Sequence, residues 1–217
     1  MTKIYLLLLV SVLVVTGIAG TEGDFQLVVN REWVEKSCGK EALPRFISWE
    51  ELIRRNKNAS DRQKLEMVNC FFNRINYAED IDVWGVKDYW ATPYEFLCKN
   101  EGDCEDYAIA KYFTLMAMGM KEEKLYIMYV KARQWGTTQS HMVLAYHDRP
   151  GAEPLILDNL IDSVKPASKR TDLSPVFGFN GKELLMAKQR AEGKPPSSSG
   201  QLKVWQNLVK NMSEKNH

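Results

Sequence analysis

Glu101-Gly102-Asp103-Cys104-Glu105-Asp106-Tyr107-Ala108 is the stretch that decides the fold, because it places a thiol at the start of a helix. Asp103 is a favourable N-cap residue, and Gly102 permits a sharp turn into the helix. Apolar residues at helical spacing supply the buried face that follows: Tyr107, Ala108, Ile109, Tyr112, Phe113, Leu115 and Met116. Cys104 therefore falls in the first turn, where free N–H groups and the helix dipole favour the reactive thiolate.

Four carboxylates surround this thiol in the sequence, namely Glu101, Asp103, Glu105 and Asp106. Negative charge nearby raises the pKa of a thiol and opposes the effect of the helix dipole. A hard divalent cation would neutralise these groups, so the stretch also suggests a metal. The competing interpretation of Cys104 is a core cysteine or one half of a disulfide.

Composition bounds the class of protein. The chain has 217 residues, of which 45% are hydrophobic and 26% charged, enough for one globular domain with a well-buried core. Its formal net charge of +1 gives no basic surface for nucleic acid, so that class is set aside.

The first residues have the pattern of a secretory signal. Lys3 is followed by an uncharged, apolar run from Ile4 to Val15, and Gly17-Ile18-Ala19 offers small residues for cleavage. We therefore predict a signal peptide at residues 1–19 and a single mature domain at 20–217, located in the periplasm. The alternative is an uncleaved membrane anchor, because the uncharged run extends to Gly20.

An oxidising compartment makes the four cysteines informative. Cys38, Cys70, Cys98 and Cys104 allow three pairings if all are bridged, and the sequence does not choose among them. Their spacing matches no zinc site. A bridge between Cys104 and Cys98 is the strongest competitor to catalysis, because it would consume the nucleophile.

Helices are predicted on both sides of the cysteine stretch. Residues 20–47 suggest only a short strand and turn. The capping-box pattern at Ser48 predicts a short helix through Arg55, and the same pattern at Ser60 opens a longer one with Cys70 packed beside its apolar face. A last helix presents one apolar face that is expected to pack on the body, made of Leu202, Trp205, Val209 and Met212.

Between these helices lies an aromatic loop that contains Trp84 and Trp90 beside glycine and proline. Such residues are typical of a packed surface turn. Because the loop immediately precedes the Cys104 helix, either tryptophan is also a candidate wall of a cleft beside the thiol.

The second half of the chain changes to the period of strands. Strands are predicted at residues 125–130, 141–146 and 154–158, and polar residues 134–140 separate the first two. A tight turn at Pro150-Gly151 would pair the last two strands antiparallel and place His141 opposite residues 158–160. His141 and Asp158 are therefore expected to meet at one edge of the sheet.

A helix-capping cysteine, a histidine and an aspartate are the parts of a thiol hydrolase or acyltransferase. Cys104 would attack a carbonyl carbon, His141 would transfer the proton, and Asp158 would orient the imidazole. His147 is the second candidate base, although it lies at the turn. The predicted class is α+β, with N-terminal helices and a nucleophile-bearing helix packed on an antiparallel sheet.

These residues also carry a family resemblance. The string Asp88 to Pro93, the GDCEDYA motif at 102–108, the HMVLAY motif at 141–146 and Leu157-Asp158-Asn159 resemble the bacterial transglutaminase-like cysteine peptidases. The resemblance implies a papain-like, transglutaminase-type fold and a triad of Cys104, His141 and Asp158. It also implies calcium dependence, with Asp103 and Glu105 as ligands. Asp106 and Glu101 are lesser candidates.

The resemblance further implies a task and a partner. Periplasmic members of this kind cleave large cell-surface adhesins near the N-terminus, at a paired-alanine site, and so promote biofilm dispersal. They are inhibited by the periplasmic domain of an inner-membrane receptor for cyclic di-GMP. Two alternatives remain open: amide transfer by the same triad, as in transglutaminases, and a non-catalytic calcium-binding interaction module.

Overall fold

The computed structural model describes residues 29–134, 136–181 and 199–215. The predicted signal peptide lies outside these residues. The helices are α1 (Arg31–Cys38), α2 (Leu43–Asn56), α3 (Asp61–Phe72), α4 (Asp80–Val83), α5 (Pro93–Lys99), α6 (Cys104–Ala117) and α8 (Ser199–Lys215), with 3₁₀ turns η1 (Glu122–Lys124) and η2 (Ala167–Lys169). The strands are β1 (Asn76–Tyr77), β2 (Glu101–Gly102), β3 (Leu125–Gln134), β4 (Thr137–Tyr146), β5 (Leu155–Leu157), β6 (Lys165–Pro166) and β7 (Leu173–Phe179).

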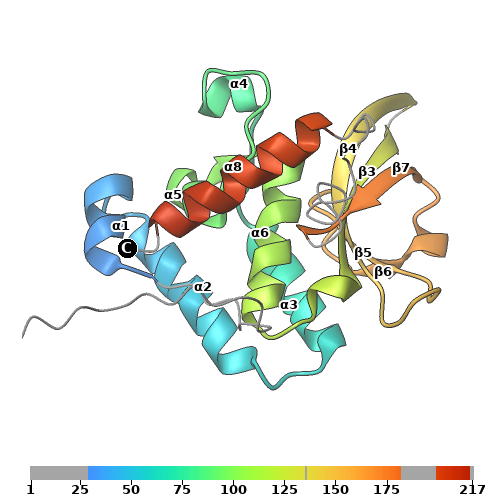
Figure 1. The fold of residues 1–217 in the computed structure, drawn as a ribbon, viewed down its shortest axis with the longest axis horizontal. Helices are drawn as coiled ribbons and strands as arrows, with labels where there is room; N and C mark the ends of the chain where they lie inside the picture. The colour runs from blue at the N-terminus through green and yellow to red at the C-terminus, as the bar shows by residue number, and fades with distance from the viewer. Residues whose placement is uncertain (1–28, 135, 182–198, 216–217) are drawn as a thin grey trace, which may run out of the picture.

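Helix α6 is the centre of the molecule. It packs against β4 and β3 on one side and against α2, α3 and α5 on the other (Figure 1). The five-stranded sheet has the order β6-β5-β4-β3-β7, and every neighbouring pair is antiparallel. The predicted α+β class, with helices on an antiparallel sheet and the cysteine at the start of a helix, is confirmed.

The described part of the N-terminal region, from residue 29 onward, is helical and differs from the short strand and turn predicted over residues 20–47; residues 20–28 lie outside the described residues. Two helices stand there, because Asn30 caps α1 by accepting a hydrogen bond from the Trp33 N–H (3.0 Å), and Pro44 occupies the first turn of α2. Ser48 lies inside α2, where its hydroxyl donates to the Pro44 carbonyl (2.8 Å). The helix predicted from Ser48 therefore exists but begins earlier.

Helix α3 begins at the predicted capping box, where Ser60 and Gln63 each accept from the other's backbone N–H. Its buried face includes Leu65, Val68 and Phe72, as the helical spacing predicts. The expectation that Cys70 is packed is wrong, since this thiol is exposed. It points away from the face that α3 buries against α6.

The β3–β4 hairpin is longer than predicted. Residues 137–140, expected to be part of a polar connection, continue β4 up to the turn at Gly136, whose φ of 80° suits glycine. Beyond this exposed tip, His141 to Tyr146 are all buried. Met142 and Leu144 belong to the main core, whereas Val143 and Ala145 belong to a second cluster covered by Ala167 and Leu173. Both faces of β4 are thus covered.

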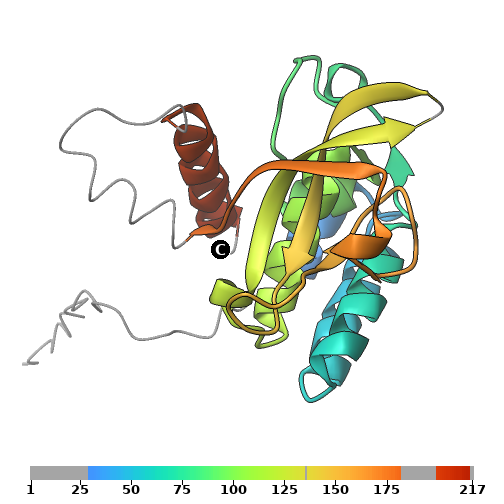
Figure 2. The same cartoon turned by 90° about the vertical axis from the view of Figure 1, so that its right-hand side faces the viewer.

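Helix α8 crosses in front of α6 in Figure 1, and Figure 2 shows it at one side of the molecule. Trp205 stacks on Phe113 of α6 (centroids 5.4 Å apart), which confirms that this helix packs on the body. Among the described side chains, Trp205, Leu208 and Met212 form the buried face, whereas Val209, predicted to belong to it, is 45% exposed. Leu202, the other residue predicted there, lies outside the described side chains. Within the described residues, none of the helices combines the length and the apolar composition needed to cross a bilayer.

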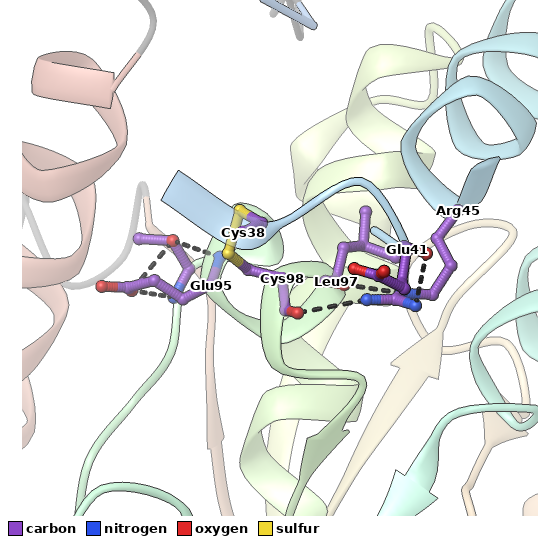
Figure 3. The surroundings of a disulfide bond; sticks show 7 residues. Cys38, Glu41, Arg45, Glu95, Leu97 and Cys98 are labelled. Carbon is purple, nitrogen blue, oxygen red and sulfur yellow. Dashed lines mark hydrogen bonds between the residues drawn. A yellow bond between two sulfur atoms is a disulfide. The ribbon is translucent and has the colours of Figure 1, made fainter. Parts of the chain in front are cut away.

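A disulfide joins Cys38 at the end of α1 to Cys98 in α5 (Figure 3). Arg45 of α2 supports the same corner, because its guanidinium donates to the carbonyls of Leu97 (2.8 Å) and Cys98 (3.1 Å). The three helices are therefore tied together just before the chain enters β2 and α6. The competing pairing of Cys98 with Cys104 is excluded, and Cys104 is a free thiol.

Candidate active site

Cys104 occupies the first helical position of α6, as the sequence predicts. At this position its backbone N–H has no acceptor within the helix and points out of the helix end. The sulfur accepts a hydrogen bond from the backbone N–H of Met142 in β4. The free thiol is thus placed beside the strand residue that follows His141.

The thiol lies in an unfavourable electrostatic setting for ionisation. Its Sγ–H donates to the Glu105 carboxylate (3.1 Å). Burial raises the pKa of Cys104, the charge and hydrogen bond of Glu105 and the charge of Asp103 raise it further, and the Met142 N–H acts in the opposite direction. The carboxylates therefore hold the sulfur as a thiol unless their charge is neutralised.

His141 and Asp158 meet as predicted, with His141 Nε2 and Asp158 Oδ1 2.8 Å apart. The β4–β5 register pairs Leu144 with Leu157, so Asp158 lies one residue beyond the end of β5 and turns toward His141. Both side chains are buried, at 4% and 0% exposure. Since Nε2 contacts Asp158, Nδ1 is the ring nitrogen left to exchange a proton with a thiol.

Asp158 is held by more than His141. Its Oδ1 also accepts from the Leu160 N–H (3.0 Å), and its Oδ2 accepts from Nη2 of Arg170 (2.6 Å). Burial acts to raise the pKa of Asp158, but His141, the Leu160 N–H and Arg170 outweigh it and lower this pKa to about 2. Arg170 was missed by the sequence analysis, because it lies in a loop with no recognisable pattern.

An acidic cluster surrounds the start of α6. Ligand atoms of Asp80, Asp103 and Asp106 lie within 4.8 Å of one another. Glu105 belongs to two further groups of this kind, one with Asp80 and Asp88 and the other with Asp103 and Cys104. The sequence analysis named Asp103, Glu105 and Asp106 but missed Asp80 and Asp88. Glu101, also a candidate, is exposed and belongs to none of these groups among the described residues.

Two of the three buried carboxylates of this cluster, Asp80 and Asp103, have an oxygen without a partner among the described residues, whereas both oxygens of Asp106 accept backbone N–H groups. Burial raises the pKa of Asp80 to about 6, despite the hydrogen bond from the Tyr89 N–H, and burial with the neighbouring Glu105 raises that of Asp103 to about 10. Burial likewise raises the pKa of Asp106, although it accepts from the Ala91 N–H. Oδ1 of Asp80 and Oδ1 of Asp103 are buried and have no hydrogen-bond partner among the residues that the structure describes. Such oxygens fit a hard cation such as Ca²⁺, which binds six to eight oxygens.

The other candidate residues lie outside this constellation. Trp90 is buried and stacks on Phe179 of β7 (5.9 Å), so it is part of the core. Trp84 is half-buried and packs on Tyr89 (4.5 Å) in the loop that carries Asp88. His147, the second candidate base, directs Nδ1 to the Ala152 carbonyl (3.2 Å) within its turn. His141 is therefore the histidine that contacts Asp158.

Comparison with known proteins gives a consistent result. A family model described as bacterial transglutaminase-like cysteine proteinase matches residues 38–174. The solved structure of Legionella pneumophila LapG is 38% identical, with a TM-score of 0.67, and the match covers 85% of this chain and 98% of LapG. Calcium-bound LapG matches at 38% identity and a TM-score of 0.66, over 85% and 99% of the two chains. A search of curated proteins gave no match.

Proposed function

The chain belongs to the bacterial transglutaminase-like cysteine proteinase family, and from this membership we propose that it is a calcium-dependent periplasmic endopeptidase that cleaves the N-terminal region of a large cell-surface adhesin. The observation that carries the proposal is the placement of a free thiol, Cys104, beside the strand that bears the hydrogen-bonded His141–Asp158 pair. The similarity to LapG over 85% of the chain supports the same assignment.

The proposed mechanism uses Cys104, His141 and Asp158 as a triad. His141 accepts the thiol proton at Nδ1, and Cys104 Sγ attacks the carbonyl carbon of the scissile peptide bond. The Cys104 N–H, free at the start of α6, donates to the oxyanion that forms. His141 then gives its proton to the leaving amine, and water hydrolyses the thioester to release the acid and the thiol. Asp158 holds Nε2 and stabilises the imidazolium throughout.

Calcium would be held at the start of α6, with Asp103 and Glu105 as predicted ligands and Asp80 as the addition from the fold. The unpartnered oxygens of Asp80 and Asp103 support this assignment. One of the similar solved structures is a calcium-bound LapG. When bound, the cation would cancel negative charge around the thiol and so favour the thiolate.

The setting of this activity follows from the signal-like sequence and from the family. The mature chain would act in the periplasm, release the adhesin by cutting at a paired-alanine site, and so promote biofilm dispersal. The periplasmic domain of an inner-membrane cyclic di-GMP receptor would bind and inhibit it. Adding that domain in equimolar amount to the protease should stop cleavage, and continued cleavage would contradict the receptor assignment.

The central experiment is cleavage of the N-terminal region of a large surface adhesin from the same organism. Residues 20–217 with calcium should cut it once, at the paired alanines, and Cys104→Ala should leave it intact. Cys70→Ala is the matched control, because it removes the other free cysteine, which is exposed on α3. A substrate in which both alanines are replaced by glutamate should resist cleavage.

Three outcomes would redirect the assignment. An uncut adhesin in the presence of folded, reduced, calcium-loaded protein would contradict the proposed substrate. If a fluorescent primary amine such as dansylcadaverine were instead incorporated by the wild type and not by Cys104→Ala, the triad would catalyse amide transfer. A protein that performs neither reaction, with Cys104→Ala indistinguishable from wild type, would be a binding module.

A further inference from the structure

A buried arginine lies directly behind the proposed triad. Arg170 stands between η2 and β7, and its side chain is 3% exposed. Its Nη2 donates to Asp158 Oδ2 at 2.6 Å, while Asp158 Oδ1 contacts His141. The two oxygens of Asp158 thus face different partners, the histidine on one side and the guanidinium on the other.

Arg170 is itself held in a fixed position. Its Nε and Nη2 donate to the two carboxylate oxygens of Asp172, at 3.0 and 2.7 Å, a paired geometry that fixes the plane of the guanidinium. Its backbone N–H donates to Ala167, and its carbonyl accepts from Leu173. Asp172 is 39% exposed, so a chain of contacts runs from the surface through Arg170 and Asp158 to His141.

We propose, on the basis of the function proposed above, that Arg170 is a positioning residue of the protease, which clamps Asp158 so that its carboxylate remains charged and directed at His141. Asp172 supports the clamp from the solvent side. An isolated carboxylate buried to 0% exposure would tend to become neutral or to rotate, and a neutral Asp158 would not stabilise the imidazolium.

A second cation near Asp158 does not replace Arg170. Lys111 of α6 is buried, and its ammonium donates to the side-chain oxygens of Asn69 and Asn73 at 2.8 Å. Burial lowers the pKa of Lys111 to about 7, although the charges of Asp158 and Asp162 act to raise it. The guanidinium, in contrast, stays charged throughout the pH range of the enzyme. Arg170 is therefore the permanent counter-ion of Asp158.

The test measures the reactivity of Cys104 directly and needs no adhesin. Iodoacetamide alkylation of Cys104 is followed as a function of pH in calcium-loaded protein carrying Cys70→Ser, which removes the other free thiol. Arg170→Gln should slow alkylation near neutral pH by about ten- to a hundredfold. Arg170→Gln removes one of the three groups that lower the pKa of Asp158, beside His141 and the Leu160 N–H, so this pKa should rise and the acid limb of the profile should move to higher pH.

Two further variants separate charge from geometry. Arg170→Lys keeps the positive charge but not the forked contact, and it should slow alkylation less than Arg170→Gln does. Asp172→Asn leaves Arg170 charged and loosens its outer support, so it should slow alkylation by about two- to threefold without moving the acid limb. Adding Arg170→Gln to Asp158→Asn should cause no further loss, because Arg170 acts through Asp158.

A merely structural arginine would behave differently. If Arg170→Gln lowered the melting temperature but left the rate and the acid limb at wild-type values, the proposal would be overturned. If Arg170→Gln failed to fold, Arg170→Lys would decide: a slower reaction supports the clamp, and a wild-type rate overturns it.

His141→Gln serves as the reference for the triad. If His141→Gln reacts as fast as the wild type, the proposed triad itself fails. If His141→Gln is slow and Arg170→Gln is normal, only the clamp fails.

Discussion

The proposed active site has two sides: the start of α6, called the helix side, and the edge of the sheet, called the sheet side. The buried carboxylates of the two sides differ in their hydrogen-bond partners and in the direction of their pKa shifts. At the sheet edge, both oxygens of Asp158 have donors and its pKa is lowered to about 2. At the start of α6, Asp80 and Asp103 each keep a buried oxygen without a partner, and their pKa values are raised. On the sheet side both carboxylate oxygens of Asp158 are paired within the protein, whereas on the helix side the proposed cation would supply the missing positive charge. If calcium binds as proposed, the sheet side is the fixed part of the site and the helix side is the part whose charge depends on the ion.

The largest effect is expected from a substitution of Asp158 on the sheet side. Asp158→Asn removes the charge that stabilises the imidazolium and leaves Arg170 opposite a neutral amide, so kcat for adhesin cleavage should fall by about 10²- to 10⁴-fold with little change in KM. Asp162→Asn is the matched control, because this exposed aspartate lies in the same loop and its side chain accepts a hydrogen bond from Asn73 (3.2 Å) rather than from His141 or Arg170. If Asp158→Asn kept the activity of the wild type, Asp158 would not be a member of the triad.

The next largest effect is expected from removing the Cys38–Cys98 disulfide, which ties α1 to α5 just before the start of α6. The Cys38–Cys98 bridge closes a sequence separation of 60 residues, so the double variant Cys38→Ser/Cys98→Ser should lose about 4 kcal/mol of unfolding free energy. Urea denaturation measures this loss, and Cys70→Ser is the control for removing a cysteine that forms no bridge. Because the bridge does not involve Cys104, the folded double variant should still cleave its substrate. Loss of activity without unfolding would show that the bridge acts on the thiol.

The third prediction concerns calcium binding at the acidic cluster on the helix side. At a concentration of about 100 times its Kd, the ion should stabilise the protein by about 2.7 kcal/mol and raise the melting temperature by about 5–10 °C. Asp80→Asn should raise the calcium concentration needed for this shift by about ten- to a hundredfold, because it removes a buried ligand. Asp82→Asn, an exposed position in the same short helix α4, should leave the calcium response unchanged. An unaltered response in Asp80→Asn would exclude Asp80 as a ligand.

The sequence predicted the residues whose signals are local. The position of Cys104 follows from the N-cap and the apolar period of α6, and the contact of His141 with Asp158 follows from two strands and the turn between them. The same reasoning missed Asp80 and Arg170. Asp80 and Asp103 are 23 residues apart in the sequence, and Arg170 contacts Asp158 from a loop. These contacts depend on the tertiary structure, and no local sequence pattern predicts them.

The errors in the fold have a related cause. Residues 20–47 suggested only a short strand and turn, but the residues from Arg31 onward form α1, because Asn30 caps the helix and Val34 is buried against the core. Residues 20–28 lie outside the described part of the chain. In α8 the helical period allowed more than one apolar stripe. Packing on Phe113 selects the stripe through Trp205 and Leu208 and leaves Val209 in solvent. Tertiary contacts decided between alternatives that the sequence pattern left equivalent.

The smallest effect is expected from Gly102→Ala, which tests the packing around Gly102 on the helix side. Gly102 pairs with Tyr77 in the short β1–β2 ladder, and a Cβ added there would lie 2.7 Å from Cε2 of Phe96 and would also meet the Asp106 carboxylate. Phe96 cannot move aside, since it is fully buried between Phe72 and Tyr107. Gly102→Ala should therefore lower the unfolding free energy by about 1–3 kcal/mol.

Gly102→Ala should also weaken calcium binding while sparing the sheet side. Displacement of Asp106 would disturb its hydrogen bond with the Ala91 N–H (2.8 Å) and the acidic cluster around it, so the calcium midpoint should rise. The Asp158 clamp lies on other elements, so the acid limb of Cys104 alkylation at saturating calcium should stay in place. Gly200→Ala in α8 is the control, because no described atom outside the neighbouring helix backbone lies within 4 Å of the added Cβ and alanine favours a helix. If Gly102→Ala moved the acid limb as far as Arg170→Gln does, the two sides would be coupled and the separation drawn between them would be wrong.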